Sequence, residues 1–291
     1  MHPRALKTKP DVPSPYRSEN GLELMTMTAE GGNWFLVPVT IIAGATVVPW
    51  NHPLEVDAHD FPTLASRGLH SEIELNLTRT ITGRSLAEIT QLAQPGALSS
   101  AGFMAGDETI LPVLKGDNRL VAKLGLTHAQ MTRPLLHICN MIREDSKREG
   151  RAVRNHAILY TVLYNGRAIS LDIQFTKGGQ KSIFDDRLDG AWTIKIRRDL
   201  DEAETNLLNR AYAHLDKEKR DILTRKLSEM LTGEMQPFYI YRYGFYEGHT
   251  AWRADPVAIA FIFGLKSIKE IEAAFPGQLD KVLTQHFTSE N

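Results

Sequence analysis

The chain has 291 residues, of which 42% are hydrophobic and 24% charged, and its net charge is −1. This composition is typical of a folded globular protein; it excludes a disordered chain and gives no overall charge that would attract nucleic acid or an anionic membrane. Cys139 is the one cysteine, so an intramolecular disulfide and a zinc site built from several cysteines are both excluded. We therefore expect a soluble, cytoplasmic protein with no nucleic-acid or membrane partner.

The first part of the chain contains an uncharged stretch at residues 34–50. It follows a Pro-, Lys- and Ser-rich segment, 1–20, which we expect to be flexible and which has no apolar run typical of a secretory signal. The uncharged stretch is short for a membrane span and contains two prolines. Its Val, Ile and Thr content predicts two buried strands, 34–42 and 45–48, joined by a turn, rather than a membrane anchor.

Residues 70–77 alternate in a way that predicts a strand with His70 and Glu72 on one face. A histidine and a carboxylate two positions apart on a strand can bind the same divalent metal ion. The preceding loop contains further candidate ligands, which are His59, Asp57 and Asp60. No HExxH motif accompanies them, and the pattern is more typical of the solvent face of a half-exposed sheet. A metal-dependent hydrolase centred on His70 and Glu72 is therefore one alternative function.

The middle of the chain is predicted to be helical. Ser85 and Glu88 form a capping-box pattern, which predicts a short helix that ends before a Pro-Gly pair. Apolar residues at helical spacing predict two further helices, 109–124 and 127–143. The charged segment 144–154 that follows is the predicted boundary between two lobes.

Part of this helical region, 120–138, resembles the rhythm of a helix-turn-helix DNA-binding unit. However, Pro134 would interrupt the second helix, and that helix carries few basic residues. We predict instead a buried helical hairpin, or a helix that begins late at Thr132. His128 and His137 are then expected to be capping or core residues.

Three other groups in this region are predicted to be structural. The segments 106–108 and 116–119 each contain Gly followed by an acidic residue, which is typical of turns whose carboxylates cap a helix. Cys139 lies in an apolar helical pattern with no activating base close in sequence. We expect it to be a small core residue and not a nucleophile.

The second half of the chain predicts sheet and then helices. Residues 157–163 and 169–175 are strand-like, and Asn165-Gly166 between them is a strong hairpin signal. The remaining predicted features, in chain order, are a turn at 177–180, a strand at 191–196, two helices of which the second ends at Gly233, a strand at 239–245, helices beginning at Asp255-Pro256 and at Ser267, and a last amphipathic helix within 279–287.

The segment 238–252 holds seven of the 23 aromatic residues of the chain, together with several charged groups. Charged groups among aromatic side chains are costly to bury unless they are paired or face a pocket, so we place the candidate site here. A carboxylate beside an imidazole can orient it as a general base, and two guanidinium groups can bind an anion. The expected roles are Glu247 and His249 as the acid/base pair, Arg242 and Arg253 as an anion clamp, and Tyr241, Tyr243 and Tyr246 as the pocket wall. The alternative is a structural cluster in which Arg253 pairs with Asp255 or Glu247.

These observations predict an α+β protein with antiparallel sheet elements covered by helices, as one domain or as two closely packed lobes, 21–150 and 151–291. The chain has no Walker P-loop, no GxGxxG after a strand and no GxSxG elbow, which excludes the usual nucleotide-binding and acyl-hydrolase patterns. The leading functional hypothesis is an enzyme that acts on a small polar or anionic substrate. The competing hypothesis is a non-catalytic ligand-binding or protein-interaction module that uses the same aromatic segment.

Overall fold

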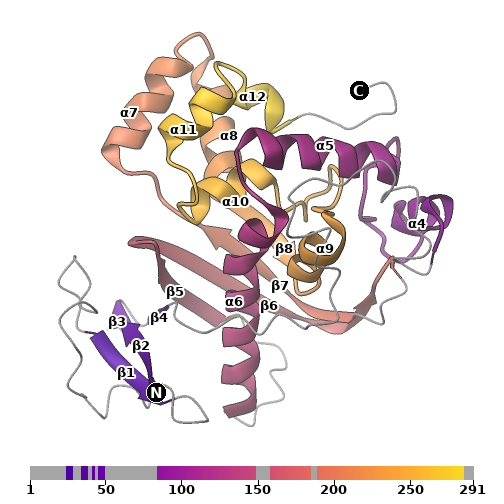
Figure 1. The fold of residues 1–291 in the computed structure, drawn as a ribbon, viewed down its shortest axis with the longest axis horizontal. Helices are drawn as coiled ribbons and strands as arrows, with labels where there is room; N and C mark the ends of the chain where they lie inside the picture. Colours follow the sequence, from indigo (N-terminus) through magenta and orange to yellow (C-terminus); the bar gives the residue numbers. More distant parts are fainter. Residues whose placement is uncertain are drawn as a thin grey trace.

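In the computed structural model, helices pack around a sheet in an α+β architecture (Figure 1), which confirms the predicted fold class. The structure describes residues 24–28, 34–38, 41–42, 45–49, 84–148, 158–184 and 189–284. In Figure 1 the helices α7, α8, α10, α11 and α12 gather at one end of the molecule, and α6 passes across the sheet.

The main sheet has the strand order β3-β4-β5-β6-β7-β8. Its strands are β3 Ile41–Ile42, β4 Ala45–Pro49, β5 Ile158–Tyr164, β6 Arg167–Lys181, β7 Asp189–Arg197 and β8 Glu229–Gly233. Neighbouring strands are antiparallel except β4 and β5, which are parallel. Two further strands, β1 Leu24–Thr28 and β2 Trp34–Pro38, pair antiparallel in a separate sheet. The strand predicted at 45–48 is thus confirmed as β4, whereas the single strand predicted at 34–42 is wrong, because this range is divided into β2 and β3, which belong to different sheets.

The hairpin between β5 and β6 is built as the sequence predicts. Asn165 and Gly166 have φ angles of 49° and 71°, and this left-handed pair matches the twist of the flanking strands. The turn predicted at 177–180 is wrong, because β6 runs through these residues. Its pairing with β7 shifts register between Phe175 and Gln180. A bulge within one long strand therefore takes the place of a turn.

The helices are α4 Leu86–Ala93, α5 Ile110–Lys123, α6 His128–Arg148, α7 Glu202–Ala211, α8 Lys217–Ser228, α9 Gln236–Tyr243, α10 Pro256–Ile262, α11 Ile268–Ala274 and α12 Leu279–Val282. Both predicted capping boxes, Ser85 with Glu88 and Ser267 with Glu270, are formed in full. The Asp255 carboxylate accepts a hydrogen bond from the Val257 N–H at the start of α10. Each such cap stabilises its helix by about 1 kcal/mol.

Two helix limits in this region need comment. Helix α6 begins at His128, as the predicted helix 127–143 requires and not as the alternative start at Thr132 would have it, and it contains Pro134 after its first turn. An internal proline costs about 3 kcal/mol, and the burial of most of α6 against the core offsets that cost. Helix α8 ends at Ser228, and the next residues form β8 against β7, so Gly233 ends a strand and not a helix.

The strand predicted at 239–245 is also wrong, because α9 occupies most of this segment. Gly244, with a φ of 64°, ends the helix in the left-handed conformation that glycine adopts most easily. Tyr239 and Tyr243 are four residues apart and both buried, as one helix face requires. The alternating tyrosines looked like a strand because the helix is buried on more than one side, so burial does not follow a helical period.

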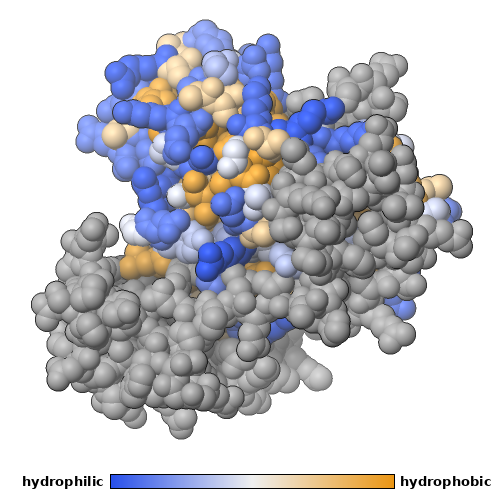
Figure 2. All heavy atoms as spheres, in the orientation of Figure 1, coloured by the Kyte–Doolittle hydropathy of each residue, from blue (hydrophilic) through white to orange (hydrophobic). Residues whose placement is uncertain are grey.

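One hydrophobic cluster contains the buried side chains of α4–α6, β5–β8 and α8–α12. It therefore joins described elements on both sides of the segment 144–154. On the face shown in Figure 2, hydrophilic residues cover most of the described helical end, and hydrophobic residues are visible in its middle, near the position of α10. Within the described ranges, no helix is both long enough and apolar enough to span a bilayer.

Candidate functional site

The segment between α9 and α10, residues 244–255, carries most of the predicted site residues. Gly248 fixes how close this segment lies to the loop before α5. A Cβ on Gly248 would stand 2.1 Å from Glu108 Oε2 and 2.9 Å from the Met104 Cα, so no larger residue fits without displacing that carboxylate. The Gly248 N–H donates to the Phe103 carbonyl at 2.8 Å. This close approach brings residues far apart in the chain into one cluster.

The imidazole of His249 is paired with Glu108 and not with Glu247. Its Nδ1 lies 2.8 Å from Glu108 Oε1, and its backbone N–H donates to Glu108 Oε2 at 2.8 Å. The Ala105 N–H donates to the same Oε2 at 2.9 Å, and the Glu108 side chain is fully buried. Several bonds thus hold one carboxylate behind one imidazole. The predicted helix cap at 106–108 is wrong. The Glu108 carboxylate bonds to the Ala105 N–H and to His249, and the N-cap residue of α5 is Thr109.

Arg253 is held by acidic groups of the protein itself. Its Nη2 lies 2.6 Å from Asp117 Oδ1, its Nε lies 3.1 Å from Asp255 Oδ2, and its Nη1 donates to the Glu247 carbonyl at 2.5 Å. The Arg253 side chain is only 7% exposed and that of Asp117 is fully buried. The pairing with Asp255 is the one that the structural alternative predicted. Asp117 lies inside α5 and does not cap it, so the acidic turn predicted at 116–119 is wrong.

Burial changes the proton affinity of these groups. It raises the pKa of the Asp117 carboxyl to about 7, although the neighbouring Arg253 lowers that pKa. For Arg253 itself, burial lowers the pKa, but Asp117 and Asp255 raise it by more, so the guanidinium stays charged. Burial also raises the pKa of Glu247 to about 8, against the opposing effect of a hydrogen bond from Thr250. Near neutral pH the cluster therefore contains a fixed cation and carboxyl groups that can take up protons.

Glu247 stands apart from His249 in both its contacts and its backbone. Its φ of 63° lies in the left-handed region, which is uncommon for a residue other than glycine. Its Oε2 accepts a hydrogen bond from the Thr250 hydroxyl at 3.0 Å. The expected Glu247–His249 pair is thus replaced by two separate contacts. A strained backbone at a buried carboxyl often marks a functional position.

The predicted tyrosine wall is for the most part core. Tyr243 stacks on Phe184 with ring centroids 3.7 Å apart, and Tyr246 is fully buried with its hydroxyl 2.9 Å from His128 Nδ1. Tyr241 is half-buried on α9, and the side chain of Arg242 lies outside the described residues. His128 is buried, which agrees with the prediction of a core residue and not with that of a helix cap.

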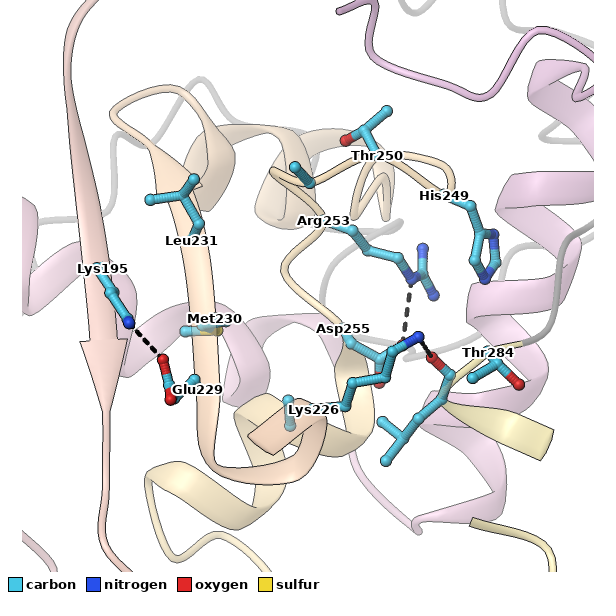
Figure 3. Close-up of a pocket in the computed structure, with 13 residues that line it drawn as sticks. Lys195, Lys226, Glu229, Met230, Leu231, His249, Thr250, Arg253, Asp255 and Thr284 are labelled. Carbon is cyan, nitrogen blue, oxygen red and sulfur yellow. Dashed lines mark hydrogen bonds and ion pairs between the residues drawn. The ribbon is translucent and has the colours of Figure 1, made fainter. Parts of the chain in front are cut away.

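An open cavity lies beside His249 and Arg253 (Figure 3), with a volume of about 540 Å³. We call it the His249 cavity. Its walls come from β7, the junction of α8 and β8, the segment before α10 and the end of α12. The charged and titratable residues that line it are Lys195, Lys226, Glu229, His249, Arg253 and Asp255. Figure 3 shows the side chains of Arg253 and His249 with the end of Lys226 on the side of Asp255, and Lys195 with Glu229 on the opposite side.

The cations of the His249 cavity differ in how they are compensated. Lys195 Nζ lies 2.5 Å from Glu229 Oε2, and Arg253 is paired as described. Lys226 Nζ donates to the Leu283 carbonyl at 3.3 Å. Among the residues that the structure describes, Lys226 forms no ion pair, so its ammonium group can pair with an anionic ligand.

The predicted metal site cannot be compared with the structure, because His70 and Glu72 lie outside the described residues, as do His59, Asp57 and Asp60. Within the part of the chain that is described, no group of three or more His, Cys, Asp or Glu side chains is arranged to hold a metal ion.

Comparison of the chain with protein-family models, with curated proteins and with solved structures found no match.

Proposed function

We propose that the protein is an enzyme that acts on a small anionic substrate bound in the His249 cavity. The observation that carries this proposal is the Glu108–His249 pair at the cavity wall, with Nδ1 and Oε1 2.8 Å apart. A buried carboxylate that accepts the Nδ1 proton makes Nε2 the basic atom of the ring, and it fixes the plane of the imidazole. This is the arrangement that general acid/base catalysis requires.

The residue roles differ from those expected from the sequence. Glu108 takes the orienting role expected of Glu247. Lys226 supplies the charge for an anion, because Arg253 already binds two carboxylates and a carbonyl. Arg253 then has a positioning role, since it ties the segment that carries His249 to α5 and to the start of α10.

The shape of the site favours a small ligand over a protein partner. A concave space of about 540 Å³ falls in the range of small-molecule sites, whereas protein interfaces are commonly flatter. Three basic side chains, Lys195, Lys226 and Arg253, line it against two carboxylates, Glu229 and Asp255. This balance supports an anionic ligand.

The test begins with binding. The thermal midpoint of unfolding is measured with inorganic phosphate, malonate and citrate as probes. At least one anion should raise the midpoint of the wild type, and Lys226→Ala should lose most of that response. Lys219→Ala is the matched control, because Lys219 lies on the same helix, is 67% exposed and does not line the cavity. An equal response in Lys226→Ala and the wild type would contradict the proposal.

Catalysis is then tested with compounds related to the anion that binds, whose conversion is followed by NMR. His249→Gln should bind the anion and fail to convert the substrate, because glutamine keeps a similar size but cannot act as a base near neutral pH. Binding with no conversion by the wild type across the series would favour the non-catalytic ligand-binding module.

A further inference from the structure

A second cavity, of about 140 Å³, lies on β6–β8 beyond the His249 cavity and opens onto the start of α9. We call it the Gln236 cavity. Its walls come from the loop after α4, from β6 and β7, from the β8–α9 junction and from the segment before α10. The residues that bear on its chemistry are Phe103, Gln180, Trp192, Gln236, Glu247 and Trp252. None of them lines the His249 cavity.

Gln236 lines this cavity and carries an acceptor that no described residue uses. The residue is 1% exposed, and its Nε2 donates to the Phe245 carbonyl at 2.9 Å, which fixes the orientation of the amide. Its Oε1 is buried and receives no hydrogen bond from any residue that the structure describes. A buried polar atom left in this way costs about 1–3 kcal/mol, so a bound ligand that donates to Gln236 Oε1 would remove an energetic cost.

Gln180 presents the complementary donor. Its Nε2 is also buried and donates no hydrogen bond to any residue in the described part of the chain. Gln180 pairs with Gly190 of β7 directly after the register shift, and its side chain lines the cavity. Two residues that line the same small cavity thus carry one unused acceptor and one unused donor.

The remaining lining residues include aromatic side chains and two carboxyl groups, Glu234 and Glu247. The Glu234 carboxylate is already paired with Arg143 and accepts a hydrogen bond from the Ala191 N–H. Phe103, Trp192 and Trp252 contribute aromatic surface. Glu247 is 6% exposed, and because burial raises its pKa to about 8, its carboxyl is mostly protonated at neutral pH. Such a carboxyl can donate or accept a hydrogen bond without adding a charge.

We propose that the Gln236 cavity is a second ligand site that takes a planar, neutral ring with amide N–H and C=O groups on its edge, as in a lactam or a cyclic ureide. An N–H of the ring would donate to Gln236 Oε1, and a C=O would accept from Gln180 Nε2. The aromatic walls favour a flat ring, and the volume limits the ligand to a single small ring. This site is separate from the proposed function of the His249 cavity and does not depend on it.

Uracil is the probe, and its binding to the full chain is measured by ligand-observed NMR and by isothermal titration. Uracil should bind, and 1,3-dimethyluracil should bind at least about tenfold more weakly, because it has no N–H to donate to a buried acceptor. Gln236→Leu should weaken uracil binding by at least about tenfold as well. Lys226→Ala is the matched control and should bind uracil like the wild type, since Lys226 lines only the other cavity.

Gln236→Leu also removes the bond to Phe245, so its folding is checked by circular dichroism. Gln180→Met, which removes the donor without touching that bond, is the second variant and should also bind uracil more weakly. The proposal is overturned if uracil shows no binding at millimolar concentration. It is equally overturned if dimethyluracil binds as well as uracil, or if Gln180→Met binds uracil like the wild type.

Discussion

Replacing Arg253 by methionine should destabilise the protein severely. The guanidinium is 7% exposed and bonds to Asp117, Asp255 and the Glu247 carbonyl. Removing one partner of a buried ion pair typically costs 3–5 kcal/mol, because it leaves an uncompensated charge in the interior. Methionine retains most of the apolar volume of the arginine stem, so the loss should come chiefly from the stranded carboxylates.

The cost should depend on pH, because the stranded carboxyls can protonate. Burial already holds the pKa of Asp117 at about 7 in the presence of Arg253, and removing that cation should raise it further. A folded-state pKa above the unfolded value means that the folded protein binds more protons, so stability is lost as pH rises between the two values. Arg253→Met should therefore lose more stability relative to the wild type at about pH 8 than at about pH 6.

Urea unfolding followed by far-ultraviolet circular dichroism measures this loss. Arg197→Met is the matched control: Arg197 also forms an ion pair, with Asp199, but it is 53% exposed and its partner 77%. Such a surface pair contributes about 0–1 kcal/mol. If Arg253→Met were no less stable than Arg197→Met at the higher pH, the idea that Arg253 holds the 244–255 segment in place would be wrong.

Three further predictions concern neighbouring groups. Gly248→Ala should lower stability by about 2 kcal/mol or more in urea unfolding, because its Cβ would displace the Glu108 carboxylate, whereas Gly106→Ala, with open space around it, should have little effect. The free energy of unfolding of the wild type should fall as pH rises from about 4.5 to 8, because the folded-state pKa of Glu247 is raised. Glu247 should contribute up to about 1.4 kcal/mol per pH unit to this slope. Glu247→Gln should flatten the slope, and an unchanged slope would exclude Glu247 as its source. Cys139 is 1% exposed and burial raises its pKa to about 12, so it should react with a thiol reagent only after unfolding; rapid reaction of the native protein would contradict its placement in the core.

Much of the fold follows from short-range signals in the sequence. The capping boxes at Ser85 and Ser267 and the Asn165-Gly166 hairpin are set by a few adjacent residues, and the structure contains all of them. The errors arose where long-range packing outweighs local preference. Pro134 lies inside a helix, and the end of the predicted helix at Gly233 pairs with β7 as a strand.

The sequence predicted some residues of the candidate site but not their partners. The aromatic segment pointed to His249 and Arg253, which do line a cavity. Their partners, Glu108 and Asp117, are 141 and 136 positions away, and nothing local distinguishes such carboxylates from helix caps. The close approach at Gly248 was the one signal that could have suggested a distant partner, because glycine in such a segment allows another chain segment to contact the backbone.

In the proposed site, Glu108 orients His249 so that Nε2 is the basic atom of the imidazole. The most direct measurement is the tautomer of His249, read from long-range proton–nitrogen NMR correlations. It is made at about pH 9, which lies well above the ordinary pKa of a histidine, so that the ring is neutral. The wild type should show the tautomer that carries the proton on Nδ1, and Glu108→Gln should shift toward the other tautomer. A wild-type His249 that carries its proton on Nε2 would contradict it.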